Sequence, residues 1–128
     1  MKVTNVLETA LYAEDLETAE AFYTDVLGLK VHSRLPGRHV FFYSGIGMFL
    51  VFNPNQTEKE KDPHGCRGRG HVAWSVSLGE LDAWLKWLKE KGVEVNDFYW
   101  PSGSRSLYFS DPAGNSLELT SPQTWGLV

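Results

Sequence analysis

Residues 71–92, HVAWSVSLGELDAWLKWLKEKG, decide the fold because they place a short strand directly before an amphipathic helix. The strand is predicted over His71–Val76 and the helix over Leu78–Lys91. Ser77 and Glu80 have the spacing of a capping box, which favours a helix start at this point. The apolar positions of the helix recur every three or four residues and form one stripe, which consists of Leu78, Leu81, Trp84, Leu85 and Leu88.

An earlier stretch, residues 8–28, ETALYAEDLETAEAFYTDVLG, repeats this pattern. It predicts a strand over Val6–Tyr12 and a helix over Leu16–Leu27. Each predicted helix is followed by a glycine, Gly28 or Gly92, where a left-handed C-cap belongs. The chain is therefore expected to consist of two similar halves.

Each half continues with three further predicted strands. They cover Leu29–Arg34, His39–Tyr43 and Met48–Asn53 in the first half, and Val93–Phe98, Ser104–Ser110 and Ser116–Thr120 in the second. The predicted fold class is α+β, with two tandem βαβββ modules that form a curved, partly open mixed sheet and carry their helices on the outer face. We expect a single domain over residues 1–128, with module 1 at 1–58 and module 2 at 68–128.

The stretch between the halves, Pro54–Gly70, reads PNQTEKEKDPHGCRGRG. It is rich in polar residues, glycine and charge, so it is predicted to be a linker or a mobile loop and not part of the core. Arg67 and Arg69 lie among its glycines. Two interpretations stay open for them: a solvated loop, or contact with an anionic substrate beneath a lid.

The composition bounds the class of protein. The 128 residues are 42% hydrophobic and carry a formal net charge of −4, which fits a folded domain and argues against a nucleic-acid partner. No apolar run approaches the roughly 20 residues of a membrane helix, and the first residues turn acidic too early for a secretory signal. We therefore expect a cytoplasmic protein without a membrane partner. The single cysteine, Cys66, excludes an intramolecular disulfide and a four-cysteine zinc site.

Three polar residues fall on strand positions that face away from the predicted helices. Successive strand residues point to opposite faces, and the apolar ones are expected to face the helix. This leaves Glu8, His71 and Glu118 on the other, polar faces. Two carboxylates and an imidazole suit a divalent Zn, Ni, Mn or Fe ion and leave open positions for a substrate. Solvated glutamates and a hydrogen-bonded histidine are the other interpretation.

Three stretches resemble the vicinal oxygen chelate superfamily: residues 7–28, LETALYAEDLETAEAFYTDVLG, residues 68–76, GRGHVAWSV, and residues 111–119, DPAGNSLEL. That superfamily includes glyoxalase I, extradiol dioxygenases, fosfomycin-resistance enzymes and bleomycin-resistance proteins. The first two stretches are similar to the openings of its two modules, and the third is similar to its closing hairpin. The resemblance covers nearly the whole chain.

The resemblance implies a metal site with ligands from four positions, which are Glu8, Val51, His71 and Glu118 in this sequence. Valine cannot bind a metal, so the expected ligands are the other three residues, with one divalent Zn, Ni, Mn or Fe ion per site. Glu8 is expected to act as the general base, and Glu118 is the second carboxylate expected to take part in catalysis. The resemblance also implies a homodimer whose sites are shared between subunits.

The implied function is a metal-dependent lyase or isomerase of the glyoxalase type, which chelates neighbouring oxygens of a small substrate. The alternative is a metal-free, ligand-sequestering protein of the bleomycin-resistance type. An extradiol dioxygenase and a fosfomycin-resistance-type transferase are less favoured. The set of Glu8, His71 and Glu118 favours the metalloenzyme, because a pure binding protein has no use for it, whereas Val51 keeps the alternative open.

Three tryptophans lie off the predicted core stripes: Trp87, Trp100 and Trp125. Exposed aromatic rings of this kind contact a second subunit or stack on a ligand. The dimer contact is the favoured interpretation. Trp100 is kept as a candidate substrate contact together with Arg67 and Arg69.

Overall fold

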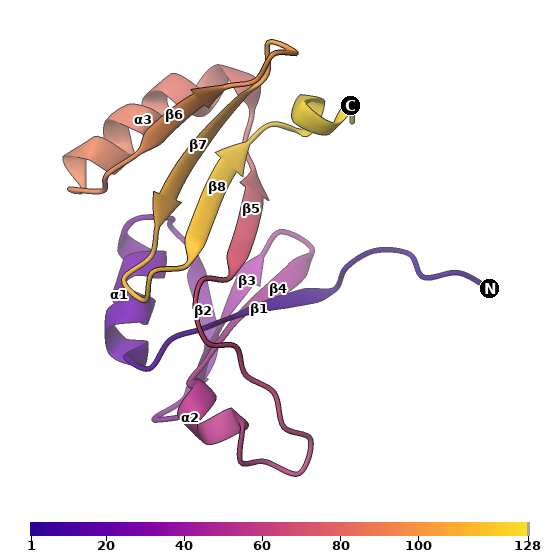
Figure 1. Ribbon diagram of the computed structural model, residues 1–128, viewed down its shortest axis with the longest axis vertical. Coiled ribbons are helices and arrows are strands. Elements are labelled where there is room, and N and C mark those ends of the chain that lie inside the picture. The colour runs from indigo at the N-terminus through magenta and orange to yellow at the C-terminus, as the bar shows by residue number, and fades with distance from the viewer. Residues whose placement is uncertain (128) are drawn as a thin grey trace. The chain divides into compact units, whose positions relative to one another are not determined.

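The computed structural model of the protein describes residues 1–127, which form two compact units, one from Met1 to Gly70 and one from His71 onwards (Figure 1). Each unit contains an open, four-stranded mixed sheet. The elements of each unit follow the order β-α-β-β-β, with short helical turns added. The predicted α+β class with two tandem βαβββ modules is therefore confirmed.

The first unit consists of β1 (Glu8–Tyr12), α1 (Leu16–Asp25), β2 (Lys30–Leu35), β3 (His39–Ser44), β4 (Gly47–Phe52) and the one-turn helix α2 (Pro54–Thr57). Its strands lie in the order β1-β4-β3-β2, with β1 parallel to β4 and the other pairs antiparallel. α1 packs on one face of this sheet, where the Tyr23 ring lies 5.6 Å from the Phe42 ring and 4.8 Å from the Phe49 ring. All three rings are fully buried and form the centre of the first core.

The second unit consists of β5 (His71–Ser75), a 3-10 turn (Leu78–Glu80), α3 (Leu81–Glu90), β6 (Asn96–Tyr99), β7 (Arg105–Ser110), β8 (Ser116–Thr120) and a second 3-10 turn (Pro122–Trp125). The strand order β5-β8-β7-β6 repeats that of the first unit, and β5 is again parallel to its neighbour. Leu81 and Leu88 of α3 are buried together with Leu107 and Leu117 of the sheet. These leucines come from the apolar stripe and the alternating strands that the sequence predicts.

The start of α3 differs from the prediction because a 3-10 turn precedes it. The predicted capping box is present, since the Glu80 carboxylate accepts hydrogen bonds from the backbone N–H and the hydroxyl of Ser77, at 3.3 and 2.7 Å. This box closes the 3-10 turn, and the α-helix begins only at Leu81. Leu78, predicted as the first residue of the apolar stripe, is therefore 53% exposed.

Two further predicted boundaries, the end of α1 and the start of β6, differ in the structure because of the way each helix ends. α1 ends at Asp25 rather than Leu27. Beyond it, Gly28 adopts the left-handed conformation predicted for a C-cap, with φ +68°. After α3 the Val93 N–H donates to a carbonyl of the helix's last turn at 2.9 Å, so the chain is still closing the helix there. β6 consequently begins at Asn96 and not at Val93.

The stretch Pro54–Gly70 is part of the first unit and not a loose linker. Its first residues form α2, and Pro54 and Thr57 are buried. Further along, His64 Nδ1 lies 2.8 Å from the Tyr12 hydroxyl of β1. The prediction of a stretch outside the core is therefore wrong for α2, whereas residues 58–70 contain no helix or strand and none of them is buried.

The helices of the described residues are short. α1 and α3 have ten residues each, about half the length that crosses a bilayer core. Within residues 1–127, no helix is long and apolar enough to span a membrane.

Candidate metal centre

The second unit has a polar sheet face on the side away from α3. Register places Glu118 of β8 beside Ala73 of β5 and Tyr108 of β7. His71 lies two residues before Ala73, so its side chain is on the same face. We call this surface the Glu118 face; its strand residues are His71, Ala73, Ser75, Asn96, Phe98, Ser106, Tyr108, Ser110, Ser116, Glu118 and Thr120.

His71 and Glu118 form the polar centre of this face. His71 Nδ1 lies 3.0 Å from the Ser116 carbonyl oxygen, and His71 Nε2 lies 3.4 Å from Oε2 of Glu118. A carbonyl oxygen only accepts hydrogen bonds, so Nδ1 carries the proton in this contact. The imidazole is 50% exposed and the Glu118 side chain 10% exposed. The pair therefore combines one accessible member with one nearly buried member.

The protonation of the imidazole decides what this pair can bind. With the proton on Nδ1, a neutral His71 presents a lone pair at Nε2 toward the Glu118 carboxylate, and two acceptors do not stabilise each other. A second proton on Nε2, or a cation shared by both atoms, removes this conflict. An imidazole that is oriented by a backbone carbonyl and stands next to a carboxylate is a donor set that Zn, Ni, Mn and Fe accept. The two residues therefore fit a divalent metal ion.

The turn between β7 and β8 is organised by a buried aspartate. The Asp111 carboxylate accepts hydrogen bonds from the backbone N–H groups of Ala113 and Asn115, both at 2.9 Å, and from the Asn115 side-chain amide, also at 2.9 Å. Gly114 has φ +89°, a conformation that other residues rarely adopt. The sequence DPAGN thus fixes the turn that leads into the strand of Glu118.

Tyr108 lies beside both candidate ligands. Its ring is 6.5 Å from the His71 ring, at an interplanar angle of 29°. Burial raises the pKa of the Tyr108 phenol, and so do the negative charge of Glu118 and a hydrogen bond to it. Tyr108 therefore presents a neutral phenol to Glu118 at neutral pH.

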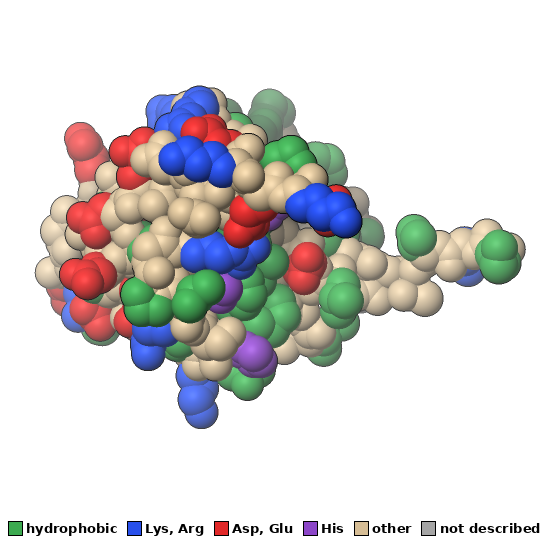
Figure 2. All heavy atoms as spheres, turned by 90° about the horizontal axis from the view of Figure 1, so that it is seen from below, with side chains coloured by type: hydrophobic (Ala, Val, Ile, Leu, Met, Phe, Trp, Pro, Cys, Tyr) green, Lys and Arg blue, Asp and Glu red, His purple; other side chains and the backbone are tan. Residues whose placement is uncertain are grey.

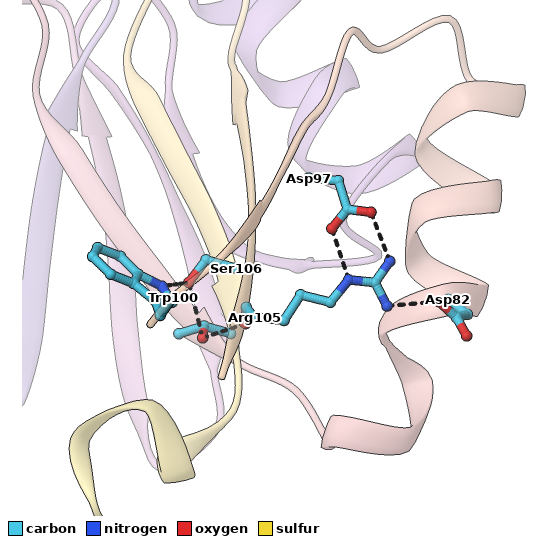
Figure 3. A network of polar contacts seen from close by, with 6 residues as sticks. Asp82, Asp97, Trp100, Arg105 and Ser106 are labelled. Atoms are coloured by element: carbon cyan, nitrogen blue, oxygen red, sulfur yellow. Dashed lines mark hydrogen bonds and ion pairs between the residues drawn. The ribbon is translucent and has the colours of Figure 1, made fainter. Parts of the chain in front are cut away.

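Trp100 is fixed over one end of the Glu118 face (Figure 3). Its indole N–H donates to the Ser106 hydroxyl at 2.9 Å, and the Ser106 hydroxyl donates to that of Thr120 at 3.2 Å. Ser106 is fully buried, so its hydrogen bond to Thr120 is shielded from water, whereas Trp100 keeps 37% of its surface exposed. The structure places this predicted substrate contact on the same face as Glu118.

The opposite face of these strands is tied to α3 by Arg105 (Figure 3). Its guanidinium makes two hydrogen bonds to the Asp97 carboxylate, at 2.7 and 2.9 Å, and one to Asp82 of α3 at 2.6 Å. The hydrogen bonds to Asp97 and then to Asp82 raise the pKa of the Arg105 guanidinium. Arg105 thus joins β6, β7 and α3 and supports the face from behind.

Glu8 occupies the place in the first unit that His71 occupies in the second. Glu8 of β1 pairs with Met48 of β4, just as His71 of β5 pairs with Ser116 of β8. Glu8 is exposed, and it lies on the sheet face turned away from α1. Both predicted edge-strand ligands therefore stand at the first residue of an edge strand.

The position equivalent to Glu118 in the first unit is Leu50. Glu118 pairs with Ala73, and Leu50 correspondingly pairs with Ala10. The predicted equivalence of Val51 is wrong by one residue, because Val51 is fully buried on the face that α1 covers. Leucine cannot bind a metal either, so the first unit supplies no ligand from β4.

Aromatic rings cover this face of the first unit, which was predicted to be polar. The centre of the Phe52 ring lies near the centres of four other rings: 6.1 Å from Tyr12, 6.0 Å from His39, 5.3 Å from Phe41 and 4.5 Å from His64. Figure 2 shows hydrophobic and histidine side chains gathered together on one side, with Lys, Arg, Asp and Glu around them. The prediction of a polar face is therefore wrong for the centre of the first unit, where apolar and aromatic side chains stand, although Glu8, Lys30, Ser33 and His39 are polar strand residues of the same face.

The predicted ligand set draws on both units. Glu8 belongs to the first unit, and His71 and Glu118 belong to the second. Among residues 1–127, no three His, Cys, Asp or Glu side chains form a group that could hold a metal ion. The contact that the structure provides is the pair of His71 and Glu118, and Glu8 as third ligand stays a prediction.

Arg67 is engaged by side chains of the first unit. Its guanidinium contacts the carboxylates of Glu14 at 3.1 Å and Glu58 at 2.8 Å, and it donates to the Asn55 side-chain oxygen at 2.8 Å. The hydrogen bond to Glu58 and that carboxylate's charge raise the pKa of Arg67. Arg69 is exposed. Contact of either arginine with an anionic substrate stays a prediction, and for Arg67 such a substrate competes with two carboxylates.

Phe98 is the residue of this face that sequence reasoning missed. Its ring lies 6.5 Å from the Tyr108 ring and 4.8 Å from the Trp100 ring. The available signal was parity, because Phe98 and Trp100 are two residues apart and so point to one side of an extended chain. Because the sequence predicts a strand that ends at Phe98, Trp100 lies outside that strand and parity does not connect the two residues.

The fold and this site define a class of small α+β proteins, in which two βαβββ modules carry a histidine–glutamate pair on the second module. The family model described as Glyoxalase/Bleomycin resistance protein/Dioxygenase superfamily matches residues 5–119. The chain belongs to this superfamily, as the resemblance of its three sequence stretches predicts.

Individual relatives carry the names of two different reactions. The Metallothiol transferase FosB of Staphylococcus epidermidis (strain ATCC 12228) is 27% identical over 126 residues, which cover 93% of this chain and 82% of the relative. The Metallothiol transferase FosB of Bacillus licheniformis is 30% identical over 120 residues, which cover 92% of this chain and 75% of the relative. The crystal structure of lactoylglutathione lyase from Agrobacterium tumefaciens is 39% identical, has a TM-score of 0.96, and is matched over 99% of this chain and 100% of that chain.

Proposed function

We propose that the chain is a divalent-metal-dependent lyase or isomerase of the glyoxalase type, which acts on a small substrate with two neighbouring oxygens. The observation that carries this proposal is the pair of His71 Nε2 and Glu118 Oε2, which face each other at 3.4 Å while Nδ1 is held by a backbone carbonyl. A second proton on Nε2 or a cation bound by both atoms stabilises this arrangement, and we assign that place to a divalent metal ion.

Glu8, His71 and Glu118 have separate roles in this proposal. His71 and Glu118 bind the metal, which when bound supplies Lewis acidity to the substrate's two oxygens. Glu8 completes the ligand set and, as general base, moves a proton between neighbouring carbon atoms of the substrate. The protein acts as a cytoplasmic homodimer in which Glu8 of one subunit joins the other two ligands of the partner, so two sites form per dimer.

The name of the Agrobacterium relative suggests the chemistry of the substrate. A lactoyl thioester carries a hydroxyl and a carbonyl on adjacent carbons, which is the pair of oxygens that one metal ion can chelate. We propose the hemithioacetal of a thiol and a 2-oxoaldehyde as substrate. Its isomerisation to the 2-hydroxyacyl thioester moves one proton from carbon to carbon and one between the oxygens, so it needs no oxidant or reductant.

Metal content and isomerase activity test this proposal together. Protein purified without chelators is expected to hold about one divalent ion per chain by elemental analysis, and to form lactoylglutathione from glutathione and methylglyoxal. Glu8→Gln is expected to lower kcat by about 100-fold or more, because the general base is lost. The control, Glu17→Gln, changes an exposed glutamate in the first turn of α1 and is expected to leave kcat unchanged.

The outcomes separate the candidate functions. A protein that takes up neither its own metal nor added Mn²⁺, Ni²⁺ or Zn²⁺ would favour the metal-free binding protein. Metal uptake without isomerase activity, combined with metal-dependent consumption of a thiol, would favour thiol transfer. Thiol transfer is the second candidate because both FosB relatives are named metallothiol transferases.

A further inference from the structure

An aromatic track leads away from the candidate metal centre across the Glu118 face. We define this track by Tyr108, Phe98 and Trp100. The distance between ring centres is 6.5 Å from His71 to Tyr108 and 6.5 Å from Tyr108 to Phe98. It is 4.8 Å from Phe98 to Trp100. The track therefore begins beside the candidate ligand His71, with Tyr108 of β7. It continues to Phe98 of β6 and to Trp100, the residue that follows β6.

The rings of the track are oriented but still accessible. The hydrogen bond from the Trp100 indole to Ser106 fixes that ring, and Phe98 meets it edge to face at 72°. Phe98 and Trp100 keep 39% and 37% of their surface exposed. Large rings that are held in place and partly wet gain contact with a flat ligand without a large loss of side-chain entropy.

The charge of the Glu118 face limits which ligand groups the aromatic track can bind. The strand residues of the Glu118 face include no lysine or arginine, so nothing among them pairs with an anionic tail. Arg105 lies on the opposite face and is paired with Asp97 and Asp82. β8 and β6 are two strand spacings apart, about 10 Å, which is the reach of a chelating group joined to one aromatic ring.

We propose that Phe98 and Trp100 are specificity-determining residues that bind an aromatic, uncharged group attached next to the two chelating oxygens of the substrate. This inference rests on the proposed function, since it needs the metal at His71 and Glu118 to hold the chelating end. It favours an aryl-substituted substrate over the methyl-substituted one. It also gives Trp100 a role in ligand stacking, whereas the sequence alone favours a dimer contact for the exposed tryptophans.

Binding of two hydroxamates to the Mn²⁺-loaded protein tests the track without any need for turnover. Benzohydroxamate and acetohydroxamate carry the same pair of chelating oxygens and differ in a phenyl or a methyl group. Isothermal titration is expected to show benzohydroxamate binding about tenfold more tightly to the wild-type protein. Trp100→Ala and Phe98→Ala are each expected to reduce this preference to about twofold, with the affinity for acetohydroxamate unchanged.

Trp87→Ala is the matched control. Trp87 is 40% exposed, close to the value for Trp100, but it lies on α3 against Lys91 and away from the track. This variant is expected to keep the full preference for benzohydroxamate. Thermal unfolding of the three variants shows that each is folded before its affinities are compared.

The possible failures are distinguishable. A protein that takes up no divalent metal overturns the proposed function and this inference with it. A metal-loaded protein that binds both hydroxamates equally, or neither, overturns the inference alone. A change of dimer dissociation in Trp100→Ala, with the preference for benzohydroxamate intact, would show that a second subunit and not a ligand covers Trp100.

Discussion

The two units have the same order of elements and the same strand pairing, but the sheet faces turned away from their helices differ. In the second unit this face holds His71, Glu118 and buried hydroxyl groups. In the first unit Leu50 stands in the place of Glu118, and rings cluster around Phe52. One backbone arrangement thus supports a polar centre in one copy and an aromatic surface in the other.

The difference teaches that the fold depends on the helix-facing residues, which leaves the other face free to change. Both helix-facing sides are uniformly apolar at their centres, with Val51 and Phe49 in one unit and Leu117 and Leu107 in the other. Side chains on the two faces of a strand alternate, so one face can keep the core while the other acquires chemistry. Substitutions that exchange residues between the equivalent faces of the two units test this separation of the core face from the other face.

The largest effect is expected from Glu118→Leu, which gives the second unit the residue found at Leu50 in the first. Metal affinity is expected to fall by about 100-fold or more, because a carboxylate ligand beside His71 is lost. The fold is expected to survive, since leucine is accommodated at the equivalent position of the first unit. Titration with Mn²⁺ and far-ultraviolet circular dichroism check both parts, and an unchanged affinity would remove Glu118 from the site.

The reverse exchange, Leu50→Glu, is expected to destabilise the protein. Leu50 is 7% exposed, and a carboxylate there replaces a buried apolar group with a charge that has to be desolvated. The expected cost is about 3 kcal/mol of unfolding free energy, which urea unfolding measures. Leu50→Met, which keeps the volume and the apolar character, serves as the control and is expected to cost less than about 1.5 kcal/mol.

The arginine that ties each sheet to its helix gives a smaller contrast. Arg105 is 12% exposed and holds Asp97 and Asp82, whereas Arg34 is 56% exposed and pairs with Glu20 of α1. Arg105→Met is expected to cost about 1–2 kcal/mol, because it leaves Asp97 partly buried without its partner. Arg34→Met is expected to leave the urea midpoint unchanged, since exposed ion pairs contribute little. Equal effects of the two substitutions would contradict this contrast.

The smallest effect concerns pH and the aromatic face of the first unit. Burial, followed by the positive charge of Arg38, lowers the pKa of His39 below its ordinary value of 6.5. The unfolded chain therefore binds a proton at a pH where the folded chain does not, so acidification through about pH 6.5 favours unfolding. His39→Gln is expected to flatten this part of the stability profile between about pH 7 and pH 5.

Urea unfolding across that range, together with an NMR titration of the His39 ring, checks this expectation. Glu60 and His64 also face this cluster, and Arg38 lowers the pKa of Glu60 below 4.5. The titration of Glu60 therefore falls below the window assigned to His39. A His39 pKa at or above 6.5 would contradict the expectation.

Much of the fold was predictable because it follows from patterns among residues that are close together in the sequence. Three such patterns are the apolar stripe of α3, the glycine after each helix and the DPAGN turn. Each of them relates residues that are only a few positions apart. The boundaries were less predictable. The 3-10 turn before α3 and the late start of β6 depend on competing hydrogen bonds of Glu80 and Val93 that a pattern of apolar residues does not record.

The candidate site was predictable as a set of residue types and not as a geometry. His71 and Glu118 share a face because strand parity requires it, and the structure brings them within 3.4 Å. The equivalence of Val51 failed by one residue, because register is decided by cross-strand hydrogen bonds and not by spacing along the chain. Phe98 was missed for a related reason, since its partners Tyr108 and Trp100 are apparent only once β6 is correctly placed.

The sequence by itself determined the repeated βαβββ order, the helical stripes, and the presence of His71 and Glu118 at strand positions away from the helices. Only the tertiary structure decided that the His71 proton lies on Nδ1, that Arg67 is engaged by Glu14 and Glu58, and that Leu50 occupies the position equivalent to Glu118. The physical reason is the range of the interactions. Secondary structure follows from neighbours along the chain, whereas tautomers, ion pairs and equivalent positions follow from atoms that only packing and strand register bring together.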